Sequence, residues 1–192
     1  MPSKFHQSFE EGLYYHVYNR TNDKALLFRC KENYRYFLRR YHHYMDPVVD
    51  TPAYCLMPTH FHFLVRVKEG LHARIEERFR RFFISYVKAL NKMYSRHGSL
   101  FQKPFNRTLI QTEHNLLRTI CYIHHNPIHH GCSFEFGIWE FCSYRQWIEG
   151  TAKDHGQSCA TAMKSLFPHE NWESLHREFD AAYVPEILDT LV

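Results

Sequence analysis

The run MPTHFHFLV, residues 57–65, limits the possible folds most strongly, because apolar and polar side chains alternate along it. Successive side chains of a β-strand point to opposite faces of a sheet. Phe61, Phe63 and Val65 therefore share one face, which has the character of a core, while His60 and His62 share the other. Two imidazoles placed side by side are close enough to bind one metal ion or one phosphate.

The periodicity of the flanking segments predicts the elements around this strand. Helical spacing of apolar side chains marks the helices, and β-forming residues mark the strands. We expect the order strand, helix, strand, strand, helix, strand, helix over residues 14–20, 31–45, 53–57, 60–68, 71–96, 105–111 and 113–126. This order predicts an α+β, ferredoxin-like βαββαβ fold with one added helix, in which helices cover one face of an antiparallel sheet and the other face is open. Residues 173–191 are expected to add one or two small C-terminal helices.

Charge is distributed unevenly along the 192 residues. Residues 1–150 hold 21 basic and 13 acidic side chains, whereas residues 151–192 hold 3 basic and 7 acidic ones. We therefore predict a basic domain over 1–150 and an acidic C-terminal extension over 151–192. Within the basic domain, residues 66–107 carry 11 basic and 3 acidic side chains. Such a charge run favours a nucleic-acid partner, and a merely solvated helix face explains it about equally well.

Composition narrows the cellular setting. We find no run of about 18 apolar residues, which a membrane span would need, and no apolar core of a secretory signal near the N-terminus. The six cysteines are scattered and form no C-x-x-C pair. We therefore expect a cytoplasmic protein with reduced thiols, without a membrane span.

The segment HNLLRTICYIHHNP, residues 114–127, predicts a helix with two kinds of stripe. One stripe is apolar, and a second, spaced by three, four and four residues, is polar and consists of Asn115, Arg118, Tyr122 and Asn126. Pro127 is expected to end this helix. Tyr122 is thus predicted on the polar side, with Asn126 one turn beyond it.

These residues suggest one site built from two elements. His60 and His62 would supply two nitrogens, and Asn126 a neutral oxygen, to a divalent metal ion. A free phenol has a pKa of about 10, so Tyr122 as a nucleophile needs a phosphodiester polarised by that ion. Its attack would give a covalent phosphotyrosine, which a second strand end can resolve. Taken singly, a His-X-His strand or a helical tyrosine is more often explained by packing.

Three segments of the chain recur in a known family in the same order. They are YHVYNR at 15–20, YCLMPTHFHFL at 54–64 and YIHHNP at 122–127, and LFQ at 100–102 and Trp139 to Tyr144 fit as well. Over roughly residues 12–147 the chain resembles the single-tyrosine HUH transposases, most closely the REP-associated tyrosine transposase-like branch.

The resemblance implies a ferredoxin-like HUH catalytic domain that cleaves and rejoins single-stranded DNA at hairpin or REP-like palindromic repeats. His60 and His62 match the HUH pair, Tyr122 the nucleophile and Asn126 the third metal-ligand position. The metal would be Mg²⁺ or Mn²⁺. Compact dimers occur among insertion-sequence relatives, but the extension after the last core helix favours a monomer. Two departures from the family pattern are Thr59 and the run KPF at 103–105.

Holding a single strand of DNA requires further side chains, for which the candidates are Asn19, Arg20, Arg78, Arg81, Lys88, Lys103 and Arg107. Asn19 has an alternative role, that of fixing a turn at the end of its strand. Trp139 and Tyr144 are expected mainly to anchor the segment after the last core helix. For the whole chain, the competing interpretation is a non-catalytic single-stranded nucleic-acid-binding module on the same open sheet.

Overall fold

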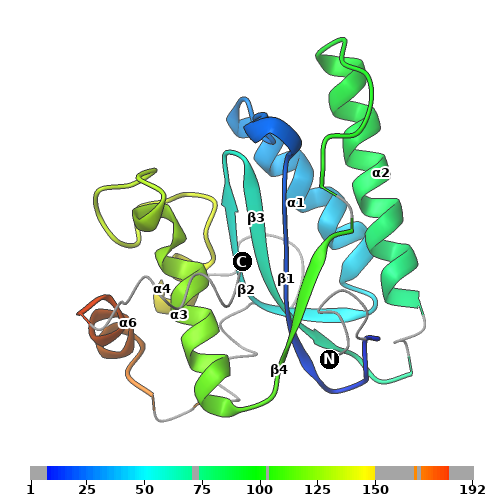
Figure 1. Ribbon diagram of the computed structural model, residues 1–192. Coiled ribbons are helices and arrows are strands. Elements are labelled where there is room, and N and C mark those ends of the chain that lie inside the picture. The colour runs from blue at the N-terminus through cyan, green and yellow to red at the C-terminus, as the bar shows by residue number, and fades with distance from the viewer. Residues whose placement is uncertain (1–7, 71–73, 103, 150–166, 168–169, 182–192) are drawn as a thin grey trace.

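The computed structural model describes residues 8–70, 74–102, 104–149, 167 and 170–181 (Figure 1). Its strands are β1 (Tyr14–Arg20), β2 (Val49–Met57), β3 (His60–Val67) and β4 (Asn106–Ile110). Its helices are the short η1 (Asn22–Lys24), α1 (Lys31–Met45), α2 (Ile75–Met93), α3 (Glu113–His129), α4 (Tyr144–Glu149) and α6 (Trp172–Ala181).

The four strands form one antiparallel sheet in the order β2-β3-β1-β4. A two-residue turn at Pro58 and Thr59 joins β2 to β3, so these strands pair as a hairpin. Helices α1 and α2 provide the longer connections from β1 to β2 and from β3 to β4. The predicted α+β class and ferredoxin-like order are therefore confirmed.

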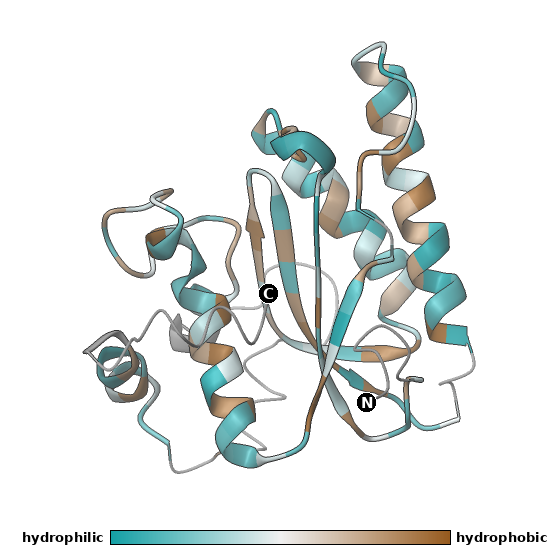
Figure 2. Cartoon of the chain, viewed as in Figure 1, coloured by the Kyte–Doolittle hydropathy of each residue, from teal (hydrophilic) through white to brown (hydrophobic). Residues whose placement is uncertain are grey.

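Helices α1 and α2 cover the apolar face of the sheet. The ring of Phe37 on α1 lies 5.4 Å from that of Phe61 and 4.8 Å from that of Phe82 on α2, measured between centroids. Tyr41, one turn further along α1, stacks on Phe63 at 3.9 Å. Hydrophobic and hydrophilic segments alternate along α2 (Figure 2), as expected of a helix with one buried side. The aromatic side of β3 is thus the centre of the core.

Helix α3 lies on the opposite face of the sheet, against β2 and β3. This face was predicted to be open, and the structure shows it covered over one half. The reason is that α3 carries its own apolar stripe, including Ile120 and Ile123, which are fully buried. Within the described structure α3 packs on β2 and β3, so the part of this face over β1 and β4, beside the histidine side of β3, carries no described helix.

Pro127 does not end α3, which continues to His129, so that prediction is wrong. A proline inside a helix removes one backbone hydrogen bond and crowds the preceding turn. Here it stands in the last turn, and the helix still closes with the His130 N–H donating to the Asn126 carbonyl at 3.0 Å. The extra turn brings the His130 ring to 4.5 Å from the ring of His60.

Strand β2 begins at Val49, four residues earlier than expected. Pro52 lies inside it. Because β2 is an edge strand and its register shifts between Asp50 and Ala53, the missing N–H of Pro52 is tolerated there. Helix α2 is shorter than predicted, and residues 71–73 lie outside the described part of the chain.

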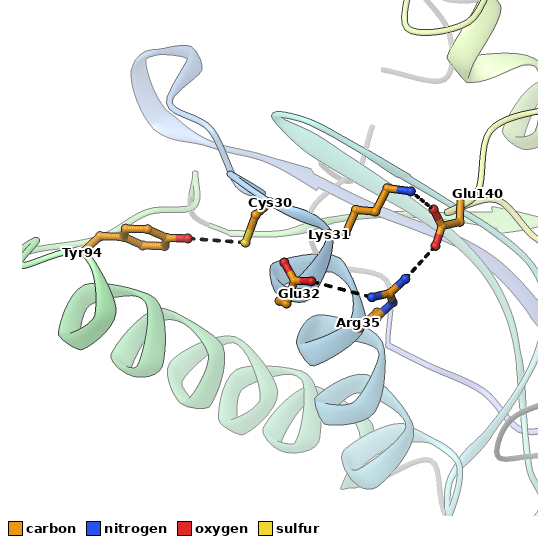
Figure 3. A network of polar contacts seen from close by, with 6 residues as sticks. All are labelled: Cys30, Lys31, Glu32, Arg35, Tyr94 and Glu140. Carbon is orange, nitrogen blue, oxygen red and sulfur yellow. Dashed lines mark hydrogen bonds and ion pairs between the residues drawn. The ribbon is translucent and has the colours of Figure 1, made fainter.

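The segment after α3 returns to the edge of the sheet and is fastened there. The Trp139 indole N–H donates to the Leu56 carbonyl at 2.9 Å. The Glu140 carboxylate forms ion pairs with two residues of α1, Lys31 at 2.6 Å and Arg35 at 3.1 Å (Figure 3). Trp139 is thus an anchor, as predicted, and the ion pairs add a second tie.

The described part of the C-terminal extension, α6, packs on α3 through buried imidazoles. His176 Nδ1 lies 2.7 Å from the Trp172 carbonyl, and its Nε2 lies 2.8 Å from Nδ1 of His124. Since a carbonyl only accepts, His176 must carry its proton on Nδ1, and its Nε2 accepts from His124. Most of the predicted acidic extension, 151–192, lies outside the described residues. No helix within the described ranges is long and apolar enough to cross a membrane.

The central position of Phe37 makes it a test of the core. Replacing Phe37 by Ala should lower the free energy of unfolding by about 3–5 kcal/mol, because the cavity is surrounded by aromatic rings that cannot collapse into it. Urea denaturation measures this change. Ile84→Ala is the matched control on α2, since Ile84 is 39% exposed, and should change stability by no more than about 0.5 kcal/mol. An equal effect of both substitutions would contradict the assigned core.

Candidate active site

A pocket of about 130 Å³ opens on the face of the sheet that α3 only half covers. Strands β1 and β3 form its floor with Tyr18, His60 and His62, and α3 contributes Tyr122. The pairing of the strands explains this set, because Tyr18 is the direct cross-strand partner of His62 and Arg20 that of His60. Alternation along two neighbouring strands therefore puts all four strand side chains on one side.

His60 and His62 meet as the sequence predicted. Their ring centroids are 5.2 Å apart, and the ring planes are almost perpendicular. Burial lowers the pKa of His60 to about 4, an effect that the nearby His130 and Arg20 reinforce and Asn126 opposes. Burial, together with His16, holds the pKa of His62 well below its usual range. Both imidazoles are therefore neutral near pH 7, the form in which a histidine nitrogen can bind a metal ion.

Each of the two imidazoles is oriented by a hydrogen bond at Nδ1. Thr59 Oγ1 lies 3.1 Å from Nδ1 of His60, and His16 Nε2 lies 3.0 Å from Nδ1 of His62. The Nε2 atoms of both rings are buried and have no hydrogen-bond partner among the described residues. Metal-binding histidines typically bind through one nitrogen while the other is held in this way.

Asn126 supplies the third buried atom with an unpaired lone pair that could bind a cation, after Nε2 of His60 and Nε2 of His62. Its Nδ2 donates to the Tyr122 carbonyl at 2.8 Å, which fixes the amide, and its Oδ1 is buried without a partner in the described structure. Leaving a buried oxygen unpaired is costly. Two imidazole nitrogens and one amide oxygen are ligands that a divalent metal ion accepts, and they are one fewer than the four protein ligands of a structural zinc site.

Tyr122 faces this set rather than the solvent. Its ring stands edge-on to His62, with 5.5 Å between centroids, and to His16 at 5.9 Å. Only 1% of the residue is exposed. The predicted polar stripe of α3 is thus divided, since Asn115 is exposed at one end while Tyr122 and Asn126 are buried against the sheet at the other.

Several residues of the site were not predicted as site residues from the sequence, among them Tyr18 and Asn106, which line the pocket. His16 lies under His62 and is fully buried. His130 reaches the pocket only because α3 passes through Pro127, and Gln102 reaches it from the loop before β4. His16 had a signal, since it lies two residues before Tyr18 in an alternating strand. Gln102 had one too, as the last residue of the LFQ segment at 100–102, whereas His130 had none, because its position depends on where the helix ends.

The predicted DNA-binding residues fall into two groups. Arg20 lines the pocket, with its Nε donating to Gln102 Oε1 at 3.0 Å. Asn19 lies at the same strand end, but its amide donates to the Gln102 carbonyl and accepts from the Arg20 N–H. This geometry supports the alternative that Asn19 fixes the strand end.

The remaining basic candidates that the structure describes are not brought to the pocket. Helix α2 lies on the other side of the sheet, where Arg78 donates to the Tyr44 carbonyl and Arg81 pairs with Glu77. Lys88 is exposed on the same helix. Arg107 pairs with Glu76 at 2.6 Å and is 9% exposed. Lys103 lies outside the described residues.

Known proteins resemble this chain in sequence and in fold. No family model matches the chain. A Haemophilus influenzae protein described as a REP-associated tyrosine transposase is 26% identical over 108 residues, which make up 52% of this chain. A solved structure of a REP-associated tyrosine transposase bound to a REP hairpin has a TM-score of 0.64 at 17% identity and covers 81% of this chain and 94% of that one. The chain is similar to the REP-associated tyrosine transposases.

The resemblance to REP-associated tyrosine transposases that was predicted from the sequence is thereby confirmed. The structural match, at 17% identity, concerns the fold alone. The chain spans 61% of the length of the Haemophilus relative. What the REP-associated tyrosine transposases bind and do is therefore a proposal for this chain.

The buried neutral imidazoles predict a loss of stability in acid. The pKa values of His16, His60 and His176 are lowered to about 3, about 4 and about 4 by burial, whereas an unfolded chain takes up these protons near about pH 6.5. Between these values the unfolded state binds more protons, so the free energy of unfolding falls as the pH drops from about 6.5 to about 4.

Urea denaturation across this range measures the effect. His176→Gln removes a titrating group remote from the pocket. It should reduce the difference in the free energy of unfolding between about pH 6.5 and about pH 4 by on the order of 3 kcal/mol. The exposed His97 gives the control His97→Gln, which should leave the slope unchanged. A slope that His176→Gln does not alter would mean that this ring is protonated in the folded protein.

Proposed function

We propose that this chain is a tyrosine transposase-like enzyme that nicks and rejoins single-stranded DNA at hairpin or palindromic repeats. The observation that carries the proposal is the convergence of Tyr122 with His60 and His62 around one pocket, from elements about sixty residues apart in the sequence, with Asn126 hydrogen-bonded to the Tyr122 carbonyl. Similarity to REP-associated tyrosine transposases, one of them seen with a REP hairpin, supports the same substrate class.

The proposed step is a transfer of one phosphodiester bond to the protein. The Tyr122 phenolic oxygen attacks phosphorus, a bond between that oxygen and phosphorus forms, and the bond from phosphorus to one strand oxygen breaks. The released strand end takes up the proton that the phenol loses. A hydroxyl from a second strand end then reverses the exchange and frees Tyr122. Because the phosphotyrosine is not hydrolysed, the phosphodiester bond can form again without a further cofactor.

We assign the metal to His60, His62 and Asn126, because their free Nε2 and Oδ1 atoms are buried and unsatisfied. An Mg²⁺ or Mn²⁺ ion held by these residues would polarise the phosphate and stabilise the charge that develops on it. The packing of α3 keeps the Tyr122 ring edge-on to His62, so the nucleophile is already oriented. Arg20, at the rim of the pocket, is suited to a neighbouring phosphate of the strand.

We expect the enzyme to act in the cytoplasm as a monomer. All four ligand and nucleophile side chains come from one copy of the chain, so no partner is needed to complete the site. Sedimentation that shows a tight dimer would contradict this expectation.

Covalent capture tests the nucleophile. The full-length protein, Mn²⁺ and end-labelled single-stranded hairpin DNA from the flanks of the gene should give a labelled adduct on a denaturing protein gel. Tyr122→Phe removes only the attacking oxygen and should abolish the adduct, whereas Tyr36→Phe, on α1 at the other side of the sheet, should retain it.

The outcomes separate the competing functions. DNA binding without an adduct on several hairpins would favour the non-catalytic binding module. Cleavage that persists in Tyr122→Phe would mean that water is the nucleophile, and the role assigned to Tyr122 would be wrong.

His16 provides a second test, directed at the metal site. His16→Phe keeps a ring under His62 but removes the acceptor at Nε2, and should weaken Mn²⁺ binding by about 10–100-fold. His16→Gln keeps a polar group at that position and should recover part of the affinity. Free Mn²⁺ measured by electron paramagnetic resonance gives the binding constant without DNA or turnover. Unchanged Mn²⁺ affinity in His16→Phe would show that this hydrogen bond does not orient the ligand.

A further inference from the structure

Two cysteines from distant parts of the chain face each other at the edge of the sheet. Cys55 lies in β2, and Cys142 lies in the segment that follows α3, where the two form an isolated antiparallel bridge. The Leu56 N–H donates to the Phe141 carbonyl at 2.9 Å, and the Ser143 N–H donates to the Tyr54 carbonyl at 3.0 Å. These bonds flank the cysteines, so Cys55 and Cys142 occupy a non-hydrogen-bonded cross-strand position.

That position brings side chains closer together than any other in an antiparallel pair. The Cα atoms of such a pair are about 4.5 Å apart, which falls within the roughly 4.4–6.8 Å that a disulfide requires. Directly opposed residues also point to the same face of the sheet. Both thiols are free, and both residues are buried, with Cys55 0% and Cys142 7% exposed. Burial, together with the neighbouring Cys142 thiol, raises the pKa of Cys55.

We propose that Cys55 and Cys142 are an oxidation site that forms a disulfide between strand β2 and the segment after α3. The oxidant is a peroxide. The Cys142 sulfur attacks one peroxide oxygen, giving a sulfenic acid and releasing water; the Cys55 sulfur then attacks that sulfenic sulfur and releases a second water. Two thiols thus lose two electrons and two protons to hydrogen peroxide, which is reduced to two waters.

The surroundings determine which thiol reacts first and how fast. Cys142 is the more exposed of the two, so it meets the oxidant first. Access depends on the segment that carries it, and this segment is tied down two residues earlier, where Glu140 receives Lys31 and Arg35 (Figure 3). The reaction is therefore slow in the intact fold and faster when Glu140 is released.

The bond would join parts of the molecule that already cooperate. Ser143, next to Cys142, lies 2.9 Å from Nε2 of His124 on α3, and Cys55 is the cross-strand partner of His62. Closing a loop from 55 to 142 restricts the unfolded chain, so the oxidised protein should melt about 5–10 °C higher than the reduced one. This modification is independent of the proposed DNA chemistry and needs neither metal nor DNA.

The experiment treats the full-length protein with hydrogen peroxide, alkylates the remaining thiols and maps peptides by mass spectrometry without reductant. A linked pair containing Cys55 and Cys142, two hydrogen atoms lighter than its parts and lost on reduction, is expected. Cys142→Ser should lose this pair and the rise in melting temperature, while the matched Cys132→Ser should keep both. Glu140→Gln should speed formation about two- to five-fold, the effect of losing an exposed ion pair.

Two results would overturn the proposal. One is recovery of Cys55 and Cys142 as separately alkylated or over-oxidised peptides after the exposed Cys30 has been oxidised. The other is a link from Cys132 to either cysteine in place of the predicted pair. Peptide mapping of the oxidised wild-type protein decides between these outcomes even if Cys142→Ser does not fold.

Discussion

The alternation of side chains along β3 is the constraint on which the rest of the molecule depends. Phe61 and Phe63 pack against α1 and α2, while His60 and His62 face α3 and the pocket. β3 lies inside the sheet and pairs on both sides. A register slip by one residue would exchange the two sets, burying imidazoles in an aromatic core and exposing the rings. Core stability and site geometry are therefore fixed by the same strand pairing.

The main feature of the site is a set of buried polar atoms that have no hydrogen-bond partner in the described structure. His60 Nε2, His62 Nε2 and Asn126 Oδ1 are removed from water without receiving a protein partner within the described structure. Such atoms lower stability, and proteins retain them where a ligand will satisfy them. Because burial also keeps the two imidazoles neutral, the pocket keeps its nitrogen lone pairs available near pH 7. The same property makes the fold sensitive to acid.

Helix α3 is held by elements that follow it in the sequence. Ser143 connects His124 to the backbone of Tyr54 in β2, and His176 of α6 bonds the other nitrogen of His124. These contacts lie on the far side of α3 from Tyr122. The orientation of the proposed nucleophile therefore depends on residues well beyond the ferredoxin-like core, which gives the C-terminal extension a structural role.

The sequence by itself determined the local elements and much of the site. Helix α1 and strand β1 have the predicted boundaries, because periodicity and turn residues act over a few positions. The joint placement of His60 and His62 followed from the two-residue period of a strand. The meeting of Tyr122 and Asn126 with these histidines followed from the recognised order of three short motifs.

Only the tertiary structure decided the remainder. Helix α3 covers half of the second face, and it continues through Pro127 so that His130 lies in the pocket. Both features depend on packing against the sheet rather than on local preference. The ion pair between Arg107 and Glu76, and the bridge between Cys55 and Cys142, join residues whose spacing in the sequence carries no pattern. A linear sequence shows which faces an element has, but the partner of each face is determined by the competition among all of them for burial.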